Sequence, residues 1–181
     1  DILAQANIVG EDQTTKTQDK LVVMLNNDVN TIAEDAEVEN LNLDEETKSV
    51  LNKEFVTSDG NVYKPIATIR IPKINIYYPI LSDTTEELLK KAPTKFWGAD
   101  PNEVGNFCIA GHNYRNKKFF SKVPTLTNGD IIEITDTKGR MVKYTVYNKY
   151  NVTEDDMTPT SPLTNGRKDI TLITCTDDSK E

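Results

Sequence analysis

Residues 169–175 read DITLITC, and this short stretch carries one of the two cysteines of the 181-residue chain. Its residues alternate in an extended chain: Ile170 and Leu172 fall on one face, and Ile173 and Cys175 fall on the other. This alternation predicts a β-strand. Cys175 would then lie at the end of the strand, where a following loop can expose its thiol.

The chain around this strand is rich in short strand-like runs separated by Pro, Gly and Asn. The run IATIRIPKINIYYPIL (66–81) changes the phase of its alternation at Pro72–Lys73, which predicts a bulge or bend between two strand segments. Further strands are expected at 106–112 (NFCIAGH) and on both sides of DTKG at 136–139, a hairpin signal. Many short strands with few helices predict an all-β barrel or sandwich.

The chain divides into three regions. Residues 1–40 are polar and acidic, and we interpret them as a flexible N-terminal segment in spite of the apolar patch LVVML at 21–25. Residues 41–61 are expected to form a helix, capped by Asp44, and a connector. Residues 62–181 hold the β-rich domain.

A second short helix is predicted at 83–93, capped by Asp83 or Thr84 and ended by Pro93. Trp97 follows it, and we interpret this side chain as an anchor in the core or in a loop rather than as a substrate platform.

The net charge of −8 is unevenly distributed. Residues 1–60 carry 14 acidic and 4 basic side chains, whereas residues 61–181 carry 15 and 17. The acidity therefore belongs to the N-terminal third and does not indicate a cationic substrate. No basic, aromatic-rich face indicates nucleic-acid binding, and no run approaches the eighteen apolar residues of a membrane span.

The one histidine, His112, ends the predicted strand 106–112, directly after a glycine. Taken alone, His112 fits a structural residue and Cys175 fits a small buried hydrophobe. Together they offer a Cys–His pair, in which an imidazole moves the proton of a cysteine nucleophile. Cys108 is expected to be buried, with a disulfide to Cys175 as the alternative. No CxxC or HxxxH spacing indicates a metal site.

Two motifs resemble those of the sortases, the cysteine transpeptidases of Gram-positive cell surfaces. TLITC (171–175) is similar to the TLxTC signature of the family, and GNFCIAGHN (105–113) is similar to the segment that bears its catalytic histidine. The resemblance covers residues 62–181. It implies a closed eight-stranded β-barrel with short helices, in which Cys175 and His112 are catalytic and Thr174 and Ile173 contact substrate.

The implied reaction needs no cofactor. The Cys175 thiolate would attack the Thr–Gly carbonyl of an LPxTG-like sorting signal and form a thioacyl enzyme. An amine from a peptidoglycan precursor or a pilin would then resolve it. The implied location is the extracytoplasmic face of a Gram-positive membrane, with the full-length protein membrane-anchored. Some sortases bind calcium near the loop before the last strand, where this chain has Glu154, Asp155 and Asp156; a solvated cluster is the plainer interpretation.

The sequence departs from the family at its C-terminal end. Sortases carry an arginine several residues after the cysteine, on an eighth strand, and no arginine follows Cys175 here. We therefore expect a truncated chain that lacks the last strand and has reduced activity. The alternatives are a non-catalytic, sortase-like barrel that binds a peptide, and an unrelated cysteine hydrolase that uses the same pair. The short stretch between 152 and 169 and the absence of a lid motif in residues 1–60 favour a housekeeping-like or class D-like enzyme.

Overall fold

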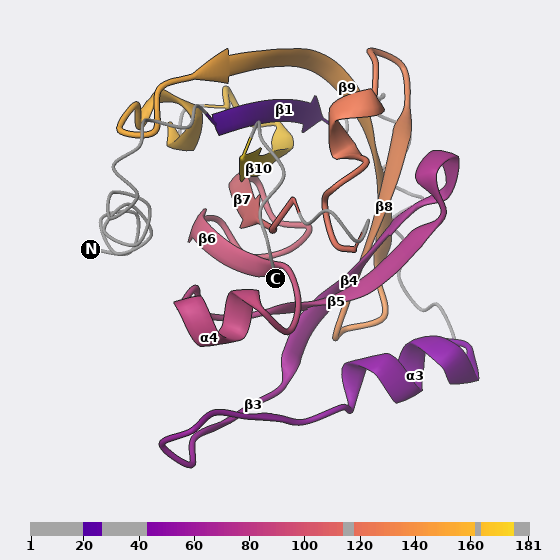
Figure 1. Ribbon diagram of the computed structural model, residues 1–181. Helices are drawn as coiled ribbons and strands as arrows, with labels where there is room; N and C mark the ends of the chain where they lie inside the picture. Colours follow the sequence, from indigo (N-terminus) through magenta and orange to yellow (C-terminus); the bar gives the residue numbers. More distant parts are fainter. Residues whose placement is uncertain (1–19, 27–42, 114–117, 162–163, 176–181) are drawn as a thin grey trace.

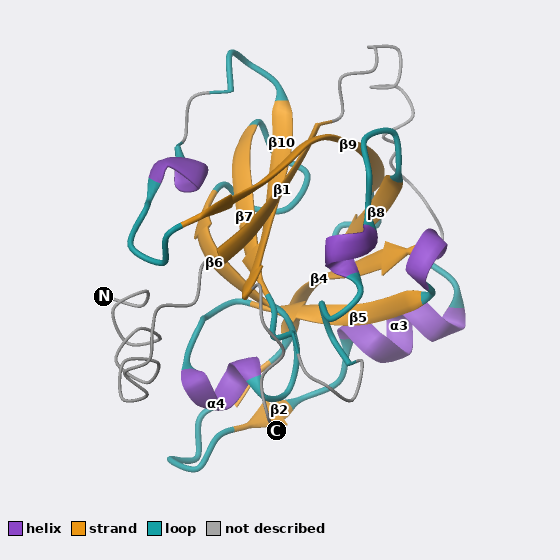
Figure 2. Cartoon of the chain, turned by 45° about the horizontal axis from the view of Figure 1, so that its top comes forward, coloured by secondary structure: helices purple, strands orange, loops and turns teal. Residues whose placement is uncertain are grey.

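The computed structural model describes residues 20–26, 43–113, 118–161 and 164–175. Within these residues eight strands form a closed barrel in the order β1-β10-β7-β6-β5-β4-β8-β9, as Figures 1 and 2 show. The strands of the barrel are β1 (Lys20–Asn26), β4 (Pro65–Ile71), β5 (Ile76–Leu81), β6 (Thr94–Gly98), β7 (Gly105–Ala110), β8 (Ile131–Asp136), β9 (Met141–Val152) and β10 (Lys168–Cys175). The all-β barrel expected from the sequence is thus confirmed.

Short elements join and cover the barrel strands. They are the helices α3 (Glu45–Leu51) and α4 (Glu86–Leu89), the two-stranded sheet of β2 (Phe55–Val56) and β3 (Val62–Tyr63), and the 3-10 turns η1 (Pro72–Ile74), η2 (Val123–Thr125) and η3 (Thr158–Thr160). In Figure 1, α3 lies beside β4 and β5, outside the barrel.

The phase change at Pro72–Lys73 marks a chain reversal. Strands β4 and β5 pair antiparallel, and η1 joins them. Asn75 ends this turn in the left-handed conformation, with φ 55°, a region that Asn tolerates better than most residues. The predicted bend is confirmed, and so is the hairpin at 136–139, which joins β8 to β9.

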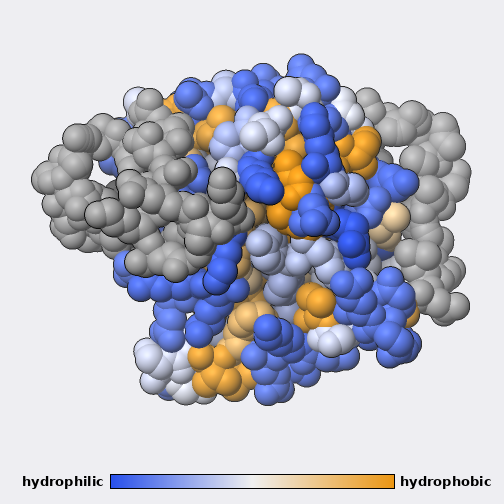
Figure 3. Space-filling view, turned by 45° about the vertical axis from the view of Figure 1, so that its right-hand side comes forward, coloured by the Kyte–Doolittle hydropathy of each residue, from blue (hydrophilic) through white to orange (hydrophobic). Residues whose placement is uncertain are grey.

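The barrel interior is filled with aliphatic and aromatic side chains, and the largest fully buried ones include Tyr144, Phe107 and Phe120. Strand alternation produces this core: on β10, Ile170 and Leu172 belong to the core cluster. On the face seen in Figure 3, hydrophobic residues form small separate patches within a mostly hydrophilic surface. The burial of apolar side chains in the barrel interior thus supplies the hydrophobic stabilisation of the fold.

The two helices begin at capped residues. Asp44 caps α3 as expected, since its carboxylate accepts a hydrogen bond of 2.7 Å from the backbone N–H of Thr47. The cap of α4 is Thr85, and neither Asp83 nor Thr84 takes this position. Thr84 instead uses its hydroxyl within the fold, at 2.7 Å from the Thr94 hydroxyl and 2.8 Å from the carbonyl oxygen of Lys95.

The interpretation of residues 1–40 as a flexible segment is wrong for residues 20–26, which form β1. This strand pairs antiparallel with β10 on one side and with β9 on the other, and so closes the barrel. The apolar patch at 21–25 explains the difference: Leu21, Val23 and Leu25 point into the core cluster. Residues 1–19 and 27–40 lie outside the described residues.

Strand β1 therefore covers the edge of β10. In the described part of the chain β10 has neighbours on both sides, β7 and β1. A strand from the N-terminal side of the sequence fills the place where we expected a missing eighth strand. Residues 176–181, which follow Cys175, lie outside the described residues.

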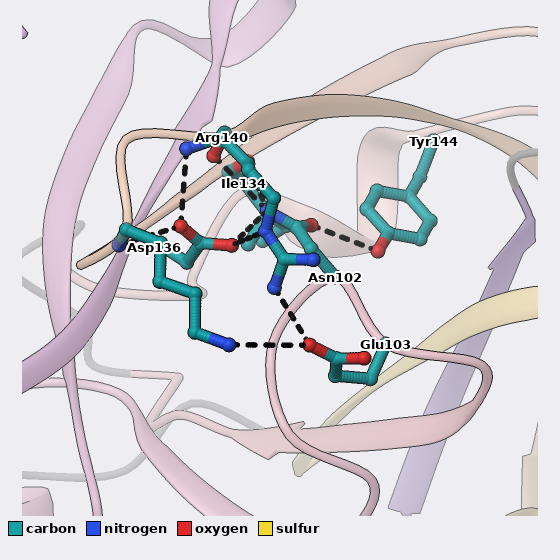
Figure 4. Close-up of polar contacts among 7 residues, drawn as sticks. Asn102, Glu103, Ile134, Asp136, Arg140 and Tyr144 are labelled. Carbon is teal, nitrogen blue, oxygen red and sulfur yellow. Dashed lines mark hydrogen bonds and ion pairs between the residues drawn. The ribbon is translucent and has the colours of Figure 1, made fainter. Parts of the chain in front are cut away.

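A buried polar cluster ties the β6–β7 connection to the β8–β9 hairpin (Figure 4). Asn102, with φ 63°, directs its amide NH₂ at the Ile134 and Arg140 carbonyl oxygens and at the Asp136 carboxylate, over 3.1–3.2 Å. Its side-chain oxygen accepts a 2.9 Å hydrogen bond from the Tyr144 hydroxyl. The Asp136 carboxylate also accepts from Arg140 Nε at 2.7 Å.

Asn102→Ala should destabilise the fold by about 2–4 kcal/mol. It leaves the buried polar partners of Asn102 without a hydrogen bond. It also forces alanine, which has no polar side chain to bond locally, into a backbone conformation of positive φ. Asn102→Gly is the matched control, since glycine tolerates this backbone but lacks the amide. Urea unfolding should show a large loss for Gly and about 1 kcal/mol more for Ala. A glycine variant as stable as the parent would show that the cluster does not stabilise the fold.

Candidate active site

The parallel pairing of β7 with β10 brings His112 and Cys175 to one edge of the barrel. The register runs to the pair Ala110–Ile173, and beyond it the Gly111 N–H donates to the Ile173 carbonyl oxygen at 3.1 Å. Parallel strands end at the same edge. Extending the register by two residues sets His112 opposite Cys175.

Strand alternation predicts that both residues lie on the outer side of the barrel. Ile109 and Leu172 belong to the core cluster, and residues three positions further along a strand fall on the opposite face. The two chain segments remain joined past the ladder, because the Asn113 side-chain NH₂ donates to the Cys175 carbonyl oxygen at 3.0 Å. Sequence reasoning gave Asn113 no role, although it directly follows His112.

Gly111 allows the chain to pass close to a buried ring. A Cβ atom at this position would lie 2.6 Å from the Phe120 side chain, well inside contact distance. Phe120 in turn donates its backbone N–H to the His112 carbonyl oxygen at 2.9 Å. The glycine before the histidine therefore lets Phe120 pack beneath the segment that carries the imidazole.

His112 is half-buried next to α4. Burial lowers the pKa of His112 below the ordinary imidazole value, and the Lys90 ammonium lowers it further, whereas the Glu86 carboxylate acts in the opposite direction. The imidazole is accordingly neutral at neutral pH, the form that accepts a proton from a thiol.

Neither cysteine forms a disulfide, and the two lie in different surroundings. Cys175 is partly exposed, whereas Cys108 is fully buried on β7, and burial raises the pKa of the Cys108 thiol to about 12. The expected burial of Cys108 is confirmed, and the alternative disulfide is not formed. Cys175 is thus the accessible thiol of the pair.

Thr174 and Ile173, the residues expected to contact substrate, are 4% and 7% exposed. The Thr174 hydroxyl is buried without a hydrogen-bond partner, as is the Asn113 side-chain oxygen. The Ile173 backbone is engaged with Gly111. Their role in substrate binding stays a prediction.

Lys20, at the start of β1, lies directly across from Cys175 in the β1–β10 register. Its ammonium donates a 3.0 Å hydrogen bond to the Asp156 carbonyl oxygen, and the residue is only 7% exposed. Sequence reasoning missed Lys20 because it placed this residue in a flexible segment. The acidic residues Glu154, Asp155 and Asp156 act electrostatically on Lys20.

Trp97 is not an anchor in the core. Its side chain is 58% exposed and lines a shallow pocket of about 620 Å³ between β6 and the residues that precede α4.

A sortase-domain family model matches residues 69–181, well over half of the chain. The chain belongs to the sortase family. Sortases are cysteine transpeptidases, and the family is associated with the processing of surface proteins in Gram-positive bacteria. The resemblance carried by TLITC and GNFCIAGHN is thereby confirmed.

Solved sortase structures share the fold. Sortase A from Corynebacterium diphtheriae is 31% identical, with a TM-score of 0.58, over 64% of this chain and 54% of that one. Sortase C1 from Streptococcus agalactiae, solved in a complex with MTSET, is 25% identical, with a TM-score of 0.56, over 62% and 61%. Sortase C from Clostridium perfringens, solved with the C-terminal cell wall sorting motif, is 26% identical, with a TM-score of 0.55, over 63% of both chains.

This sortase chain thus spans 54–63% of the length of these three structures. A search of curated proteins gives no match. Sortases of types A and C match with similar TM-scores, so the assignment to a housekeeping-like or class D-like enzyme stays a prediction.

Alkylation of the native chain with iodoacetamide should modify Cys175 and leave Cys108 intact. At pH 8 a thiol with a pKa of about 12 is ionised to roughly one part in 10⁴, and the thiolate is the reactive form. Peptide mass mapping should locate one adduct in the native state and two in denaturant. Modification of native Cys108 at a comparable rate would contradict the burial of that strand.

His112 should make the stability of this sortase depend on pH. Because the folded pKa lies below the unfolded value near 6.5, the unfolded state binds the proton more readily. The histidine's contribution is present above pH 6.5 and is lost as the pH falls through the folded pKa. Unfolding free energies of the parent should therefore drop more than those of His112→Gln between about pH 7.5 and pH 5. Parallel curves for the two proteins would show that the pKa of His112 is not lowered by folding.

Proposed function

We propose that this chain is a sortase transpeptidase with Cys175 as nucleophile and His112 as general acid and base. The observation that carries the proposal is the position of these two residues: Cys175 ends β10, and His112 follows the adjacent parallel strand β7 at the same edge of a sortase barrel. A partly exposed thiol beside an imidazole is the arrangement that nucleophilic catalysis by cysteine requires.

The first half-reaction cleaves the substrate. The neutral imidazole of His112 takes the proton of the Cys175 thiol, and the thiolate attacks the Thr–Gly carbonyl carbon of an LPxTG-like sorting signal. A C–S bond forms while the carbonyl electron pair moves to oxygen. The tetrahedral intermediate then collapses, the C–N bond breaks, and the imidazolium gives its proton to the leaving glycine amine. The product is a thioacyl enzyme.

The second half-reaction transfers the acyl group. An amine of a peptidoglycan precursor or of a pilin attacks the thioester carbon, and His112 accepts the proton that this amine loses. The Cys175 thiolate leaves and is reprotonated. Splitting one amide exchange into two steps lowers the barrier of each. The sorting motif bound to the solved sortase C from Clostridium perfringens supports a sorting-signal peptide as partner.

The proposed site of action is the extracytoplasmic face of a Gram-positive membrane, in keeping with the family. The helices in the described part of the chain are too short, or too polar, to cross a membrane. We propose that the full-length protein is held at the membrane by a segment other than these helices. No cofactor enters the proposed steps, and calcium binding at Glu154–Asp156 stays a prediction.

One observation favours the second candidate, a barrel that binds a sorting peptide without cleaving it. Among the described residues, the arginines lie away from Cys175: Arg70 pairs with Glu46, Arg140 with Glu103 and Asp136, and Arg167 with Asp169 at the opposite end of β10. Arg115 lies outside the described residues. The two functions differ in whether a thioacyl adduct forms.

Incubation of the chain with LPxTG-type peptides and triglycine, followed by mass spectrometry, tests the proposal. We expect a thioacyl adduct on Cys175 and a ligated product, both abolished in Cys175→Ala. His112→Gln should lower the rate by about 10²–10⁴-fold, the usual contribution of a positioned acid–base group. Cys108→Ala is the matched control and should retain the product.

The outcomes separate the candidates. Peptide binding without adduct or product, across several sorting motifs, would overturn the transpeptidase and support the peptide-binding barrel. Cleavage that is indifferent to the amine would point to a cysteine hydrolase.

A further inference from the structure

Lys20 of β1 and His112, which follows β7, lie on the two sides of Cys175 at the end of β10. Lys20 pairs directly with Cys175 between β1 and β10, and the β10–β7 register leads from Ala110–Ile173 to His112 and Cys175. Figures 1 and 2 show β1, β10 and β7 side by side. Since neighbouring strands are about 4.8 Å apart, the ammonium-bearing and imidazole-bearing residues flank the cysteine on its two sides.

The side chain of Lys20 lies on the same face as Cys175. Leu21 points into the core cluster together with Val23, so its neighbour Lys20 points outward, as Cys175 does. Residues directly opposite in an antiparallel pair have their Cβ atoms about 4.5–5.5 Å apart. An electrostatic interaction between Lys20 and Cys175 follows from this proximity.

Lys20 is an uncommon residue for a barrel strand because it is almost fully buried. Burial lowers its pKa, and the carboxylates of Asp156, Asp155 and Glu154 counteract this, in that order. These three residues precede η3 and lie on the connection between β9 and β10. The acidic cluster thus favours a charged ammonium at a site where burial alone disfavours it.

The Lys20 ammonium also has N–H groups that can donate to a further acceptor. It carries three N–H groups, and the Asp156 carbonyl oxygen accepts one of them. That bond holds the head of Lys20 against the β9–β10 connection. A preorganised donor of this kind stabilises charge that develops during a reaction without reorganising.

We propose that Lys20 is the cation that stabilises negative charge at Cys175. The inference has two parts, and the second, stabilisation of the oxyanion, rests on the proposed function. Lys20 first stabilises the thiolate after His112 has taken the thiol proton. When the C–S bond forms and the carbonyl electron pair moves to oxygen, the ammonium donates to that oxyanion. It stays protonated throughout, and the proton given to the leaving amine comes from His112.

A strand from the N-terminal side of the sequence therefore completes the site. Strand β1 closes the barrel beside β10 and delivers a charge to the cysteine at its end. The described arginines Arg70, Arg140 and Arg167 pair with carboxylates elsewhere in the fold.

Substitutions at Lys20 in the complete chain separate charge from packing. Lys20→Met keeps the length of the stem without charge, Lys20→Gln keeps a donor without charge, and Lys20→Arg keeps the charge. Lys149→Met is the matched control: Lys149 lies on β9, pairs with Val23 of β1 and donates to the Pro124 carbonyl oxygen at 2.8 Å. Far-UV circular dichroism and urea unfolding verify that each variant folds. If Lys20→Met does not fold, Lys20→Gln serves as the uncharged variant.

The first readout is the alkylation rate of Cys175 by iodoacetamide near pH 7, which needs no substrate. We expect Lys20→Met and Lys20→Gln to slow this rate about tenfold or more, since loss of a neighbouring positive charge lowers the thiolate population by that order. Arg and the Lys149 variant should react like the parent. Equal rates for Met, Gln and parent would overturn the proposal, and so would an Arg variant as slow as Met, because the effect would then not follow charge.

The second readout is thioacyl formation with the sorting peptide. Met and Gln should lower kcat/KM by about 10²–10³-fold, as loss of an oxyanion donor does, mainly through kcat. Arg should restore much of the rate. If the parent forms no adduct with any peptide, the proposed function fails, and the alkylation series alone then decides whether Lys20 activates the thiol.

Discussion

The parallel pairing of β7 with β10 is the constraint on which the rest of the molecule depends. Parallel strands cannot be joined by a tight turn, so the chain must build β8 and β9 between them. Asn106 of β7 reinforces the pair from outside the barrel: its side-chain oxygen accepts from the Thr171 hydroxyl at 2.7 Å, and its NH₂ donates to the Pro159 and Ser161 carbonyl oxygens at 3.0 and 2.9 Å. This one amide joins β7, β10 and the connection between β9 and β10. The same pairing places His112 beside Cys175.

Closure of the barrel follows from that pairing. A strand with an unpaired edge invites association with other chains, and β10 would expose its edge beside the reactive cysteine if β7 were its one neighbour. Strand β1 covers this edge, with hydrogen bonds to β10 on one side and to β9 on the other. Leu21, Val23 and Leu25 supply the apolar contacts that hold it. Stability of the closed barrel and completion of the site are thus linked through one seven-residue strand.

Local features of the fold were predictable from the sequence because local physics determines them. The alternation in 169–175, the turn at Pro72–Lys73 and the Asp44 cap each depend on neighbours a few residues away. The place of β1 did not follow from the sequence, since a short apolar run has no period that identifies its partners, and those partners are distant in the chain. Lys20 was missed for the same reason. The motifs around His112 and Cys175 indicated the site, whereas the position of Lys20 beside Cys175 became visible only through the strand register.

Buried polar side chains that join distant elements of the barrel are hydrogen-bonded, whereas several of those near the candidate site are not. Asn102 and Asn106, which join distant elements of the frame, use both their oxygen and their NH₂ group. The buried side-chain atoms without a partner in the described part of the chain are the Asn113 oxygen and the hydroxyls of Ser121 and Thr174. Thr174 precedes Cys175, Asn113 follows His112, and Ser121 follows Phe120, whose N–H bonds to the His112 carbonyl oxygen. Unpaired buried polar atoms cost about 1–3 kcal/mol each, so the fold concentrates this cost at one edge. A sequence selected for stability alone would remove it, and its location at the edge that carries the cysteine is what a site retained for chemistry predicts.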